Sequence, residues 1–497
     1  MSKRILAVFV LAVLFAGIGI SKEEKKAADI VADVARTMGA ANVKSVLYSA
    51  TGFVFTFGQS FRPGGPWPKF SLKSYTRMLD YQKVASREDA AWTQFENPPL
   101  GGGFQPIAGE LHVIESLNGD YAWTFGGPGP PNPDPQGSPS PGAVEDRQRQ
   151  MALTPLGWVK AAMTANPTVE TKALDGKPMS VVSFLWKGKY KINGYVDNKN
   201  LLVRTETWIN SDILGDMLVE TNYSDYRKFS GVMYPTRIVQ KQGGFPVQDL
   251  TVTAVQPNAA INIEVPDTVR RFVPSPPRVT SQKIAEGVWA IQAAGAQSAT
   301  IEFKDYSVVV EAYGGEARSL LVIGETKKLI PNKPIRYLVT THHHLDHSGG
   351  IRTYVAEGST IITHEMNKPF FEQIFQQPHT IKPDKLALNP QPANFVTVRD
   401  KYVLSDGARS MELDLVQSNT HNPGLLLVYL PKEKVLVVAD SYSVNHERPG
   451  ARTLVGLQQN LLENLQRLNL NVEQIVPIHG QKVMTLADFR KAEEMNP

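Results

Sequence analysis

The stretch Thr341–Gly350 contains side chains whose types and spacing suit a metal site. Four potential ligands fall within six residues: His342, His344, Asp346 and His347. His342 and His344 are two residues apart, so in an extended chain both imidazoles leave the same side of the backbone. Asp346 and His347 follow at the point where a helix could begin. Two neighbouring metal ions are the natural occupants of such a cluster.

Three further potential ligands follow segments that have the pattern of strands, as the cluster itself does. The segments and the residues after them are 335–340 with His342, 411–416 with His421, 435–439 with Asp440, and 474–478 with His479. Binding residues are often carried at the ends of rigid elements. A single histidine in such a place is usually a packed or surface residue, but the repetition favours one shared metal site.

The segments that must position these residues alternate between strand and helix patterns from residue 284 onward. A helix is expected at 317–329 and a buried strand at 335–340, and the alternation continues to the C-terminus. This half of the chain is therefore predicted to be an α/β domain.

The first half is predicted to be a β-rich accessory domain. Aromatic residues at every second position of 52–57 indicate a strand, and similar segments recur up to residue 255. A chain of 497 residues is too long for one core. We expect an antiparallel-sheet domain at 27–272, a Pro-rich linker at 273–283 and the α/β domain at 284–497.

The N-terminus has the pattern of an export signal. Lys3 and Arg4 precede an apolar run, 5–20, which a polar segment follows. This predicts a signal peptide at 1–21 and a periplasmic or secreted protein that is not stably inserted in a membrane once the signal is removed. An uncleaved membrane anchor is less favoured, because the run is slightly shorter than a membrane span requires.

The amino-acid composition limits the expected binding partners and the types of side chain that could bind a metal. The 52 basic and 48 acidic residues nearly balance, so no nucleic-acid partner is expected. The chain has no cysteine, which excludes disulfides and thiolate ligands. Any metal must therefore be held by imidazole and carboxylate groups.

At its potential ligands the chain resembles the metallo-β-lactamase-fold hydrolases. Their H-x-H-x-D-H motif stands here as His342-His343-His344-Leu345-Asp346-His347. Their third histidine, bridging aspartate and final histidine correspond to His421, Asp440 and His479. The resemblance covers roughly residues 284–497, and it is specific because every ligand stands in order. It implies an αββα sandwich of the metallo-β-lactamase type.

The resemblance implies two zinc ions per chain. It assigns the first to His342, His344 and His421, and the second to Asp346, His347 and His479, with Asp440 bridging them. A hydroxide held by the metals would be the nucleophile, because zinc lowers the pKa of bound water to about 7. Asp346 is the expected catalytic residue, since it could orient the nucleophile and receive its proton.

Departures from the family pattern narrow the expected chemistry. Family members usually carry aspartate where this chain has Glu311, and we expect only local packing to change there. His344 stands where the di-iron oxygen reductases of this fold have glutamate, which favours zinc and hydrolysis over iron and redox chemistry.

These observations predict an exported dinuclear zinc hydrolase that attacks the carbonyl of a small-molecule ester, thioester, lactone or β-lactam. A sulfatase- or phosphodiesterase-like hydrolase is one alternative, because it would use the same metal pair. Another is a binding protein for an apolar ligand, in which zinc only stabilises the fold. The β-rich half faintly resembles periplasmic lipoprotein-carrier proteins, in which a curved sheet encloses an apolar cavity. We therefore also consider an apolar ligand in the N-terminal domain.

Overall fold

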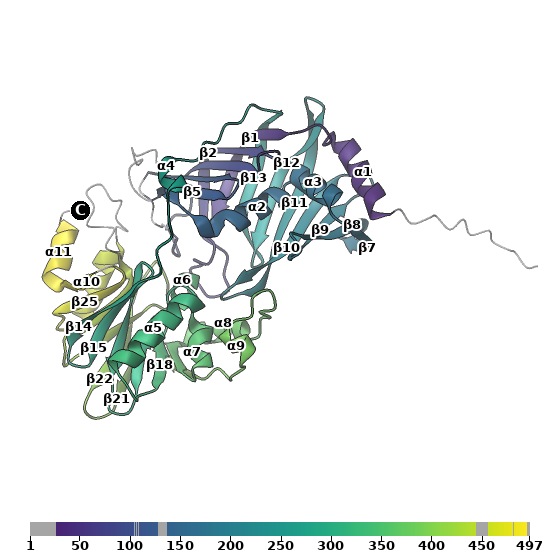
Figure 1. The fold of residues 1–497 in the computed structure, drawn as a ribbon. Coiled ribbons are helices and arrows are strands. Elements are labelled where there is room, and N and C mark those ends of the chain that lie inside the picture. The colour runs from purple at the N-terminus through teal and green to yellow at the C-terminus, as the bar shows by residue number, and fades with distance from the viewer. Residues whose placement is uncertain are drawn as a thin grey trace, which may run out of the picture.

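The structure is a computed structural model, and it describes residues 26–494 except 104, 106, 108, 128–136, 444–455 and 481. It has two halves, one built on a broad curved sheet and one on two packed sheets with helices outside them (Figure 1). The predicted signal peptide, 1–21, lies outside the described residues. In the described part of the chain, no helix combines the length and apolar character needed to cross a membrane.

The N-terminal half contains one antiparallel sheet of thirteen strands. The strands are β1 Ser45–Phe55, β2 Lys69–Asp80, β3 Ala85–Gln94, β4 Glu110–Asn118, β5 Tyr121–Gly127, β6 Ser138–Pro139, β7 Thr168–Leu174, β8 Lys177–Trp186, β9 Tyr190–Val196, β10 Leu202–Ser211, β11 Gly215–Phe229, β12 Val232–Gln242 and β13 Phe245–Pro257. Their order is β6-β5-β4-β3-β2-β1-β13-β12-β11-β10-β9-β8-β7. The first and last strands in sequence, β1 and β13, pair with each other near the middle of the sheet. The predicted antiparallel sheet is confirmed.

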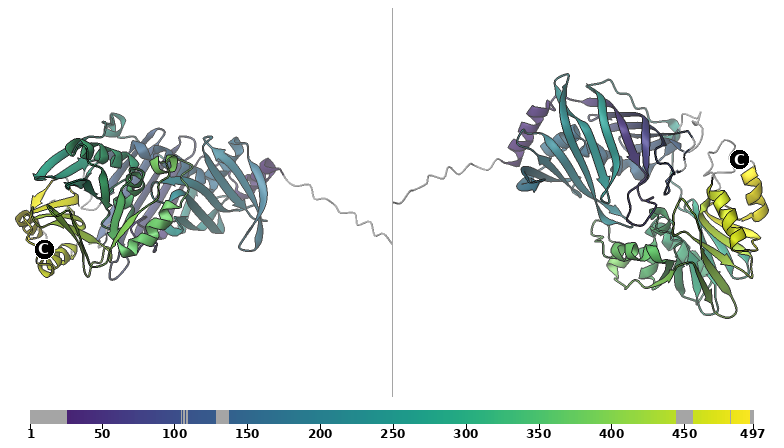
Figure 2. Two further views of the ribbon diagram at one scale, coloured as in Figure 1. Left: turned by 90° about the horizontal axis from the view of Figure 1, so that it is seen from below. Right: turned by 180° about the vertical axis from the view of Figure 1, so that it is seen from behind.

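Helices pack against one face of this sheet (Figures 1 and 2). They are α1 Ala27–Met38, α2 Val144–Leu153 and α3 Pro155–Thr164, with a short 3-10 helix at Pro141–Ala143. Thr154 caps α3, because its side chain accepts a hydrogen bond from the Gly157 amide, and Pro155 occupies the first helical position. Trp158 of α3 is fully buried against Gly194 of β9, where even a methyl group would meet its indole ring.

Replacing Trp158 by alanine is expected to destabilise the N-terminal half by about 3–5 kcal/mol, because it leaves a large cavity between helix and sheet. Denaturant unfolding followed by circular dichroism measures the free energy of unfolding. Trp186→Ala is the control, since Trp186 lies half-buried on the sheet. Equal decreases in the free energy of unfolding in the two variants would contradict the importance of Trp158 packing.

The C-terminal half is a sandwich of two sheets. The first contains β14 Val279–Ala285, β15 Val288–Ala293, β16 Ala296–Glu302, β17 Ser307–Val310, β18 Ile335–Val339, β19 Thr360–His364 and β20 Phe395–Val398. The second contains β21 Lys401–Ser405, β22 Ser410–Leu415, β23 Leu426–Leu430, β24 Val435–Ser443, β25 Gln474–His479 and β26 Met484–Thr485. Aliphatic side chains from both sheets share one buried cluster between them.

Helices cover the outer faces of this sandwich, which confirms the predicted αββα fold. They are α5 Glu316–Leu329, α6 Leu345–Ser348, α7 Ile351–Ala356, α8 Lys368–Phe375 and α9 Lys385–Leu388, with a 3-10 helix at Glu365–Asn367, on the first sheet's side, and α10 Leu457–Arg467 and α11 Leu486–Glu494 on the other. The strands β17, β18 and β19 are parallel, as are β24 and β25. Parallel strands bring their carboxyl ends to the same edge of a sheet.

The segment between the halves is partly regular. It contains α4 Asp267–Arg270, and β14 begins at Val279. The predicted linker, 273–283, was therefore too long: its last residues are paired with β15 as a strand. Residues 279–285 are largely exposed. Their sequence therefore lacks the alternation of apolar and polar residues by which a strand could have been predicted. The domain limits at 27–272 and 284–497 remain a prediction.

Candidate metal centre

Loops and strand ends of both C-terminal sheets carry the seven predicted ligands. His342 and His344 lie in the loop after β18, and Asp346 and His347 are in the short helix α6. The other three come from the second sheet: His421 from the loop between β22 and β23, Asp440 from β24 and His479 from the end of β25. The structure brings all seven together in two adjoining groups that share Asp440.

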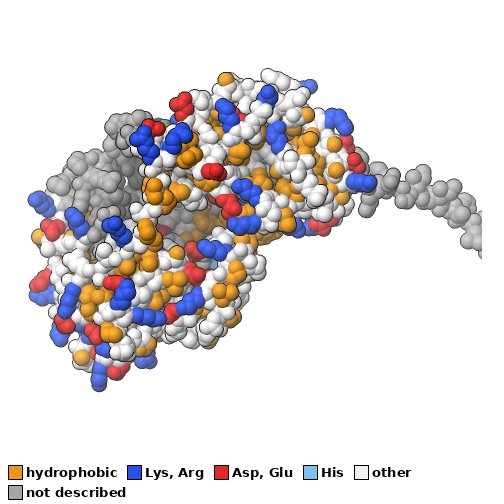
Figure 3. All heavy atoms as spheres, viewed as in Figure 1, with side chains coloured by type: hydrophobic (Ala, Val, Ile, Leu, Met, Phe, Trp, Pro, Cys, Tyr) orange, Lys and Arg blue, Asp and Glu red, His pale blue; other side chains and the backbone are white. Residues whose placement is uncertain are grey.

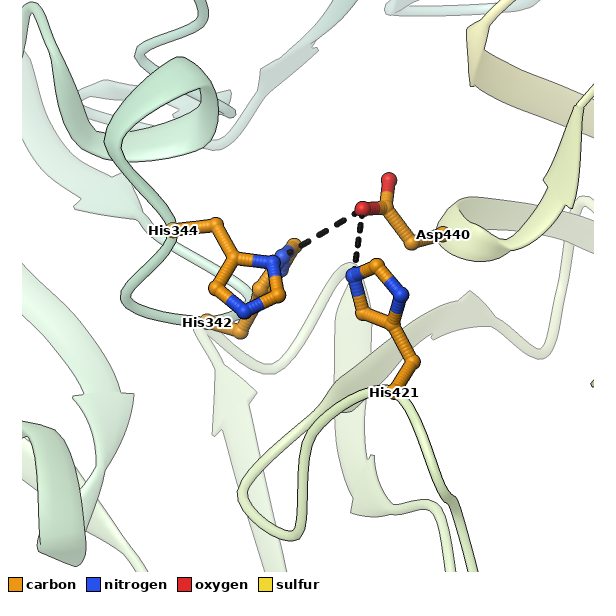
Figure 4. Close-up of side chains that lie close together, drawn as sticks. All are labelled: His342, His344, His421 and Asp440. Carbon is orange, nitrogen blue, oxygen red and sulfur yellow. Dashed lines mark ion pairs between the residues drawn. The ribbon is translucent and has the colours of Figure 1, made fainter. Parts of the chain in front are cut away.

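The first group consists of His342, His344, His421 and Asp440, and their side chains point toward one another (Figure 4). Oδ2 of Asp440 lies 2.6 Å from Nε2 of His421 and 3.6 Å from Nε2 of His342. The rings of His344 and His421 are 4.5 Å apart between centroids. All four side chains are buried.

The second group consists of Asp346, His347, Asp440 and His479. Oδ1 of Asp440 lies 2.8 Å from Nε2 of both His347 and His479. Oδ2 of Asp346 lies 3.4 Å and 3.5 Å from the same two nitrogens. Each oxygen of Asp440 therefore faces a different group, which is the arrangement that a bridging ligand requires.

These donor atoms fit a metal better than they fit one another. In the described part of the chain, Nε2 of His342 and Nδ1 of His344 are buried without a hydrogen-bond partner, and the 2.6 Å approach of Nε2 of His421 to Asp440 lacks the geometry of a hydrogen bond. Buried polar atoms are normally paired, and each unpaired one needs an explanation. Three imidazoles with free lone pairs around a carboxylate form a metal-binding site.

Burial and the neighbouring charges hold the histidines in different protonation states. Burial lowers the pKa of His342 to about 4 and that of His344 well below its ordinary value, so both are neutral and ready to bind a metal. Burial opposes charge on His347 too, but Asp440, Asp346 and Glu311 raise its pKa well above the ordinary value. Burial would raise the pKa of Asp440, but the charges of His347, His479 and His421 hold it well below its usual range.

Glu311 has a larger role than the local packing expected from the sequence. It follows β17 and is completely buried, and its backbone φ of +77° is rare for a residue with a side chain. One carboxylate oxygen accepts a hydrogen bond from the Thr341 amide at 2.8 Å, and the other lies 2.8 Å from Nδ1 of His347. Glu311 thus orients His347, with Nε2 directed at the second group.

Replacing Glu311 by glutamine is expected to weaken metal binding about 10- to 100-fold, because partners behind the ligands typically have effects of this size. Competition with a chromophoric chelator measures the affinity. Glu302→Gln is the control, since Glu302 pairs with Lys333 away from the site. Unchanged affinity in Glu311→Gln would show that Glu311 only packs.

Residues of the N-terminal half also reach the site, and the sequence analysis did not identify them. Nε2 of Gln59 donates a hydrogen bond to Oδ1 of Asp346 at 2.8 Å. The Ser60 carbonyl lies 2.9 Å from Nε2 of His344. His343, which was not expected to bind metal, contacts Ser60 Oγ at 3.1 Å and Asn422 at 2.8 Å. The contacts of Gln59 and Ser60 join residues more than 280 positions apart, so no local pattern in the sequence indicates them.

The C-terminal half matches a known family. Residues 295–479 match the family model described as the metallo-β-lactamase superfamily, and this range includes all seven predicted ligands. Among curated proteins, the chain is 23% identical over 167 residues to the 2,4-dinitroanisole O-demethylase subunit alpha of Nocardioides sp. strain JS1661. That match covers 33% of this chain and 47% of the relative, so the chain spans about half the relative's length.

Solved metallo-β-lactamases resemble part of the chain at low identity. An enzyme from Pontibacter korlensis is 17% identical, with a TM-score of 0.33, and the match covers 44% of this chain and 98% of that one. An enzyme from Pseudomonas aeruginosa in a mono-zinc form is 19% identical, with a TM-score of 0.33 and coverages of 44% and 94%.

Proposed function

We propose that the chain is a dinuclear zinc hydrolase acting on a carbonyl group, because residues 295–479 match the metallo-β-lactamase superfamily model. The observation that carries the proposal is Asp440, whose two oxygens face two separate groups of ligands. One metal would be held by His342, His344 and His421, and the other by Asp346, His347 and His479, with Asp440 between them.

The donor set supports zinc. The groups offer imidazole and carboxylate ligands, and the chain has no cysteine. Two zinc ions that share Asp440 would differ from a closed structural zinc, which has four protein ligands of its own. Zinc, when bound, polarises a carbonyl group and supplies a nucleophile from water near neutral pH.

Asp346 is the residue that we assign to proton transfer. Its side chain is about 29% exposed, so water and substrate can reach it. Oδ1 is held by Gln59, and Oδ2 points into the second group, 3.4 Å from Nε2 of His347. Oδ2 would therefore accept the proton of the attacking water and pass it to the leaving group.

The proposed substrates are carbonyl compounds: esters, thioesters, lactones and β-lactams. The chain should be tested with nitrocefin, an acyl-homoserine lactone, a thioester, and aryl sulfate and phosphate esters side by side. The O-demethylase relative adds 2,4-dinitroanisole, an aryl methyl ether, to this panel. Chelator-sensitive turnover of a carbonyl compound supports the proposal. Turnover of only the sulfate or phosphate ester would replace it with the alternative hydrolase.

We also propose that the protein is exported, on the pattern of residues 1–21. Fractionation of cells that express the whole chain tests this. Recovery of the mature protein, shortened at its N-terminus, from the periplasm or medium is expected. Recovery of the full-length chain from the cytoplasm would contradict it.

Ligand binding by the N-terminal sheet is a second candidate function, favoured by a cavity of about 480 Å³. Cavities of this size commonly bind small molecules. The lining includes Tyr48, Tyr234, Ala90 and the ion pair Arg77–Glu88. Paired charges and tyrosine hydroxyls suit an uncharged amphipathic ligand better than a purely apolar one.

The neutral fluorescent probe N-phenyl-1-naphthylamine tests this second candidate. Wild type should enhance its emission, and Ala90→Trp, which fills the cavity, should abolish the enhancement. Asp346→Ala is the matched control and should bind the probe like wild type. Loss of enhancement in both variants, or none in wild type, would contradict a separate ligand site.

A further inference from the structure

We propose that Gln59, on a loop of the N-terminal half, is a positioning residue of the metal centre, and that the Ser60 carbonyl beside it selects the metal-binding nitrogen of His344. This inference rests on the proposed function, because it concerns the same ligands. It assigns part of the centre to a half of the chain that lies outside the matched residues 295–479.

The contact of Ser60 fixes the tautomer of His344. A carbonyl oxygen can only accept a hydrogen bond, so Nε2 of His344, 2.9 Å away, must carry the proton. Nδ1 then holds the free lone pair, and it is this buried nitrogen that lacks a hydrogen-bond partner and belongs to the first group. Histidine ligands generally donate their other N–H in this way.

Gln59 fixes the orientation of the Asp346 carboxylate. Because a carboxylate only accepts, the contact at 2.8 Å must be donated by the amide nitrogen of Gln59. It engages Oδ1 and leaves Oδ2 directed at His347 and His479. Asp346 is partly exposed, so without this bond its side chain could turn toward solvent.

A second loop holds Gln59 in place. The amide of Gly102 donates to the carbonyl of Gln59 at 3.0 Å, and the amide of Gly101 donates to the carbonyl of Thr420 at 2.9 Å. A methyl group on Gly102 would lie 2.1 Å from Oε1 of Gln59 and 2.7 Å from Cε1 of His421. The backbone of this loop therefore lies directly against Gln59 and a metal ligand.

The loop that carries Gln59 also contacts the start of α6. The amide of Leu345 donates to the carbonyl of Gly58 at 3.2 Å, and a methyl group on Gly58 would meet the side chain of Leu345. The backbone on both sides of Gln59 is therefore attached to the segment that carries His344 and Asp346. The visible surface is hollowed where the two halves meet (Figure 3).

The two halves also meet at a contact that involves no predicted ligand. Asp216, at the start of β11, accepts hydrogen bonds from the amides of Thr380 at 2.9 Å and Ile381 at 3.0 Å. The amide of Asp216 donates to the carbonyl of Pro378 at 2.7 Å. Asp216→Asn weakens this contact without touching a ligand, so it is a matched control for changes at Gln59.

The test measures zinc affinity of the full chain by competition with a chromophoric chelator. Gln59→Leu keeps the side-chain volume but removes the donor, and Gln59→Asn keeps the amide on a shorter side chain. Both are expected to weaken binding of one zinc about 10- to 100-fold, as partners of metal ligands typically do. Asp216→Asn should bind zinc like wild type. Thermal unfolding of the metal-free proteins shows whether each variant is folded.

Hydrogen exchange provides a second measurement that does not depend on activity. Chelation should speed exchange at the amides of Gly101 and Gly102, while those of Thr380 and Ile381 stay unchanged. Wild-type zinc affinity in both Gln59 variants would overturn the inference and leave the proposed function intact. Failure of wild type to bind zinc would overturn both.

Discussion

Replacing Asp440 by alanine is expected to abolish turnover and to lower zinc affinity by about two to three orders of magnitude. Asp440 is buried, and its two oxygens face two groups of histidines. Removing one partner of a buried charged cluster costs about 3–5 kcal/mol, which corresponds to such a loss of affinity.

Zinc content after exhaustive dialysis measures this effect, with Asp440→Asn as the graded variant. Asparagine keeps the shape and one oxygen but loses the charge, so it should bind more zinc than the alanine variant and less than wild type. Two zinc ions retained in Asp440→Ala would mean that Asp440 is not shared by the two groups.

Replacing Asp346 by alanine should lower turnover about 10²- to 10⁴-fold, the usual contribution of a group that transfers a proton. The fold should persist, because Asp346 is partly exposed and lies in the short helix α6. Steady-state kinetics on the best substrate of the panel and thermal unfolding of the same samples measure the two effects together.

Asp346→Ala also separates catalysis from a purely structural site. If zinc were purely structural, turnover would arise elsewhere and Asp346→Ala would leave it unchanged. Loss of zinc from this variant would then appear as a lower unfolding temperature. Glu316→Ala is the control, since Glu316 lies on α5 and accepts a hydrogen bond from the Lys385 amide away from the ligands. A large fall in unfolding temperature with unchanged turnover would contradict the assignment of Asp346.

That the seven predicted ligands lie together could be anticipated, because each stands in or after a strand or loop with its own local pattern. The spacing of His342, His344 and Asp346 is local, so it is visible in the sequence. The antiparallel sheet and the α/β character of the C-terminal half could be predicted from alternating and helical periodicities. The αββα layers were implied by the resemblance to the metallo-β-lactamase-fold hydrolases. What remained open was how distant segments meet.

Glu311 and Gln59 illustrate that limit. Glu311 has an unusual backbone conformation that only the turn after β17 explains, and its contact with His347 spans 36 residues. Gln59 meets Asp346 across 287 residues and between the two halves. The close approach of Gly58 to Leu345 and of Gly102 to Gln59 is likewise a contact between distant segments. The contact of Gln59 follows from docking of the halves, and that of Glu311 from packing within the C-terminal half; no local periodicity encodes either.

Anomalous X-ray diffraction at the zinc absorption edge, on crystals of the zinc-loaded protein, tests the central claim most directly. The account predicts two strong peaks, one among His342, His344 and His421 and the other among Asp346, His347 and His479, with Asp440 between them. A single peak, or none at these side chains, would contradict a dinuclear zinc centre.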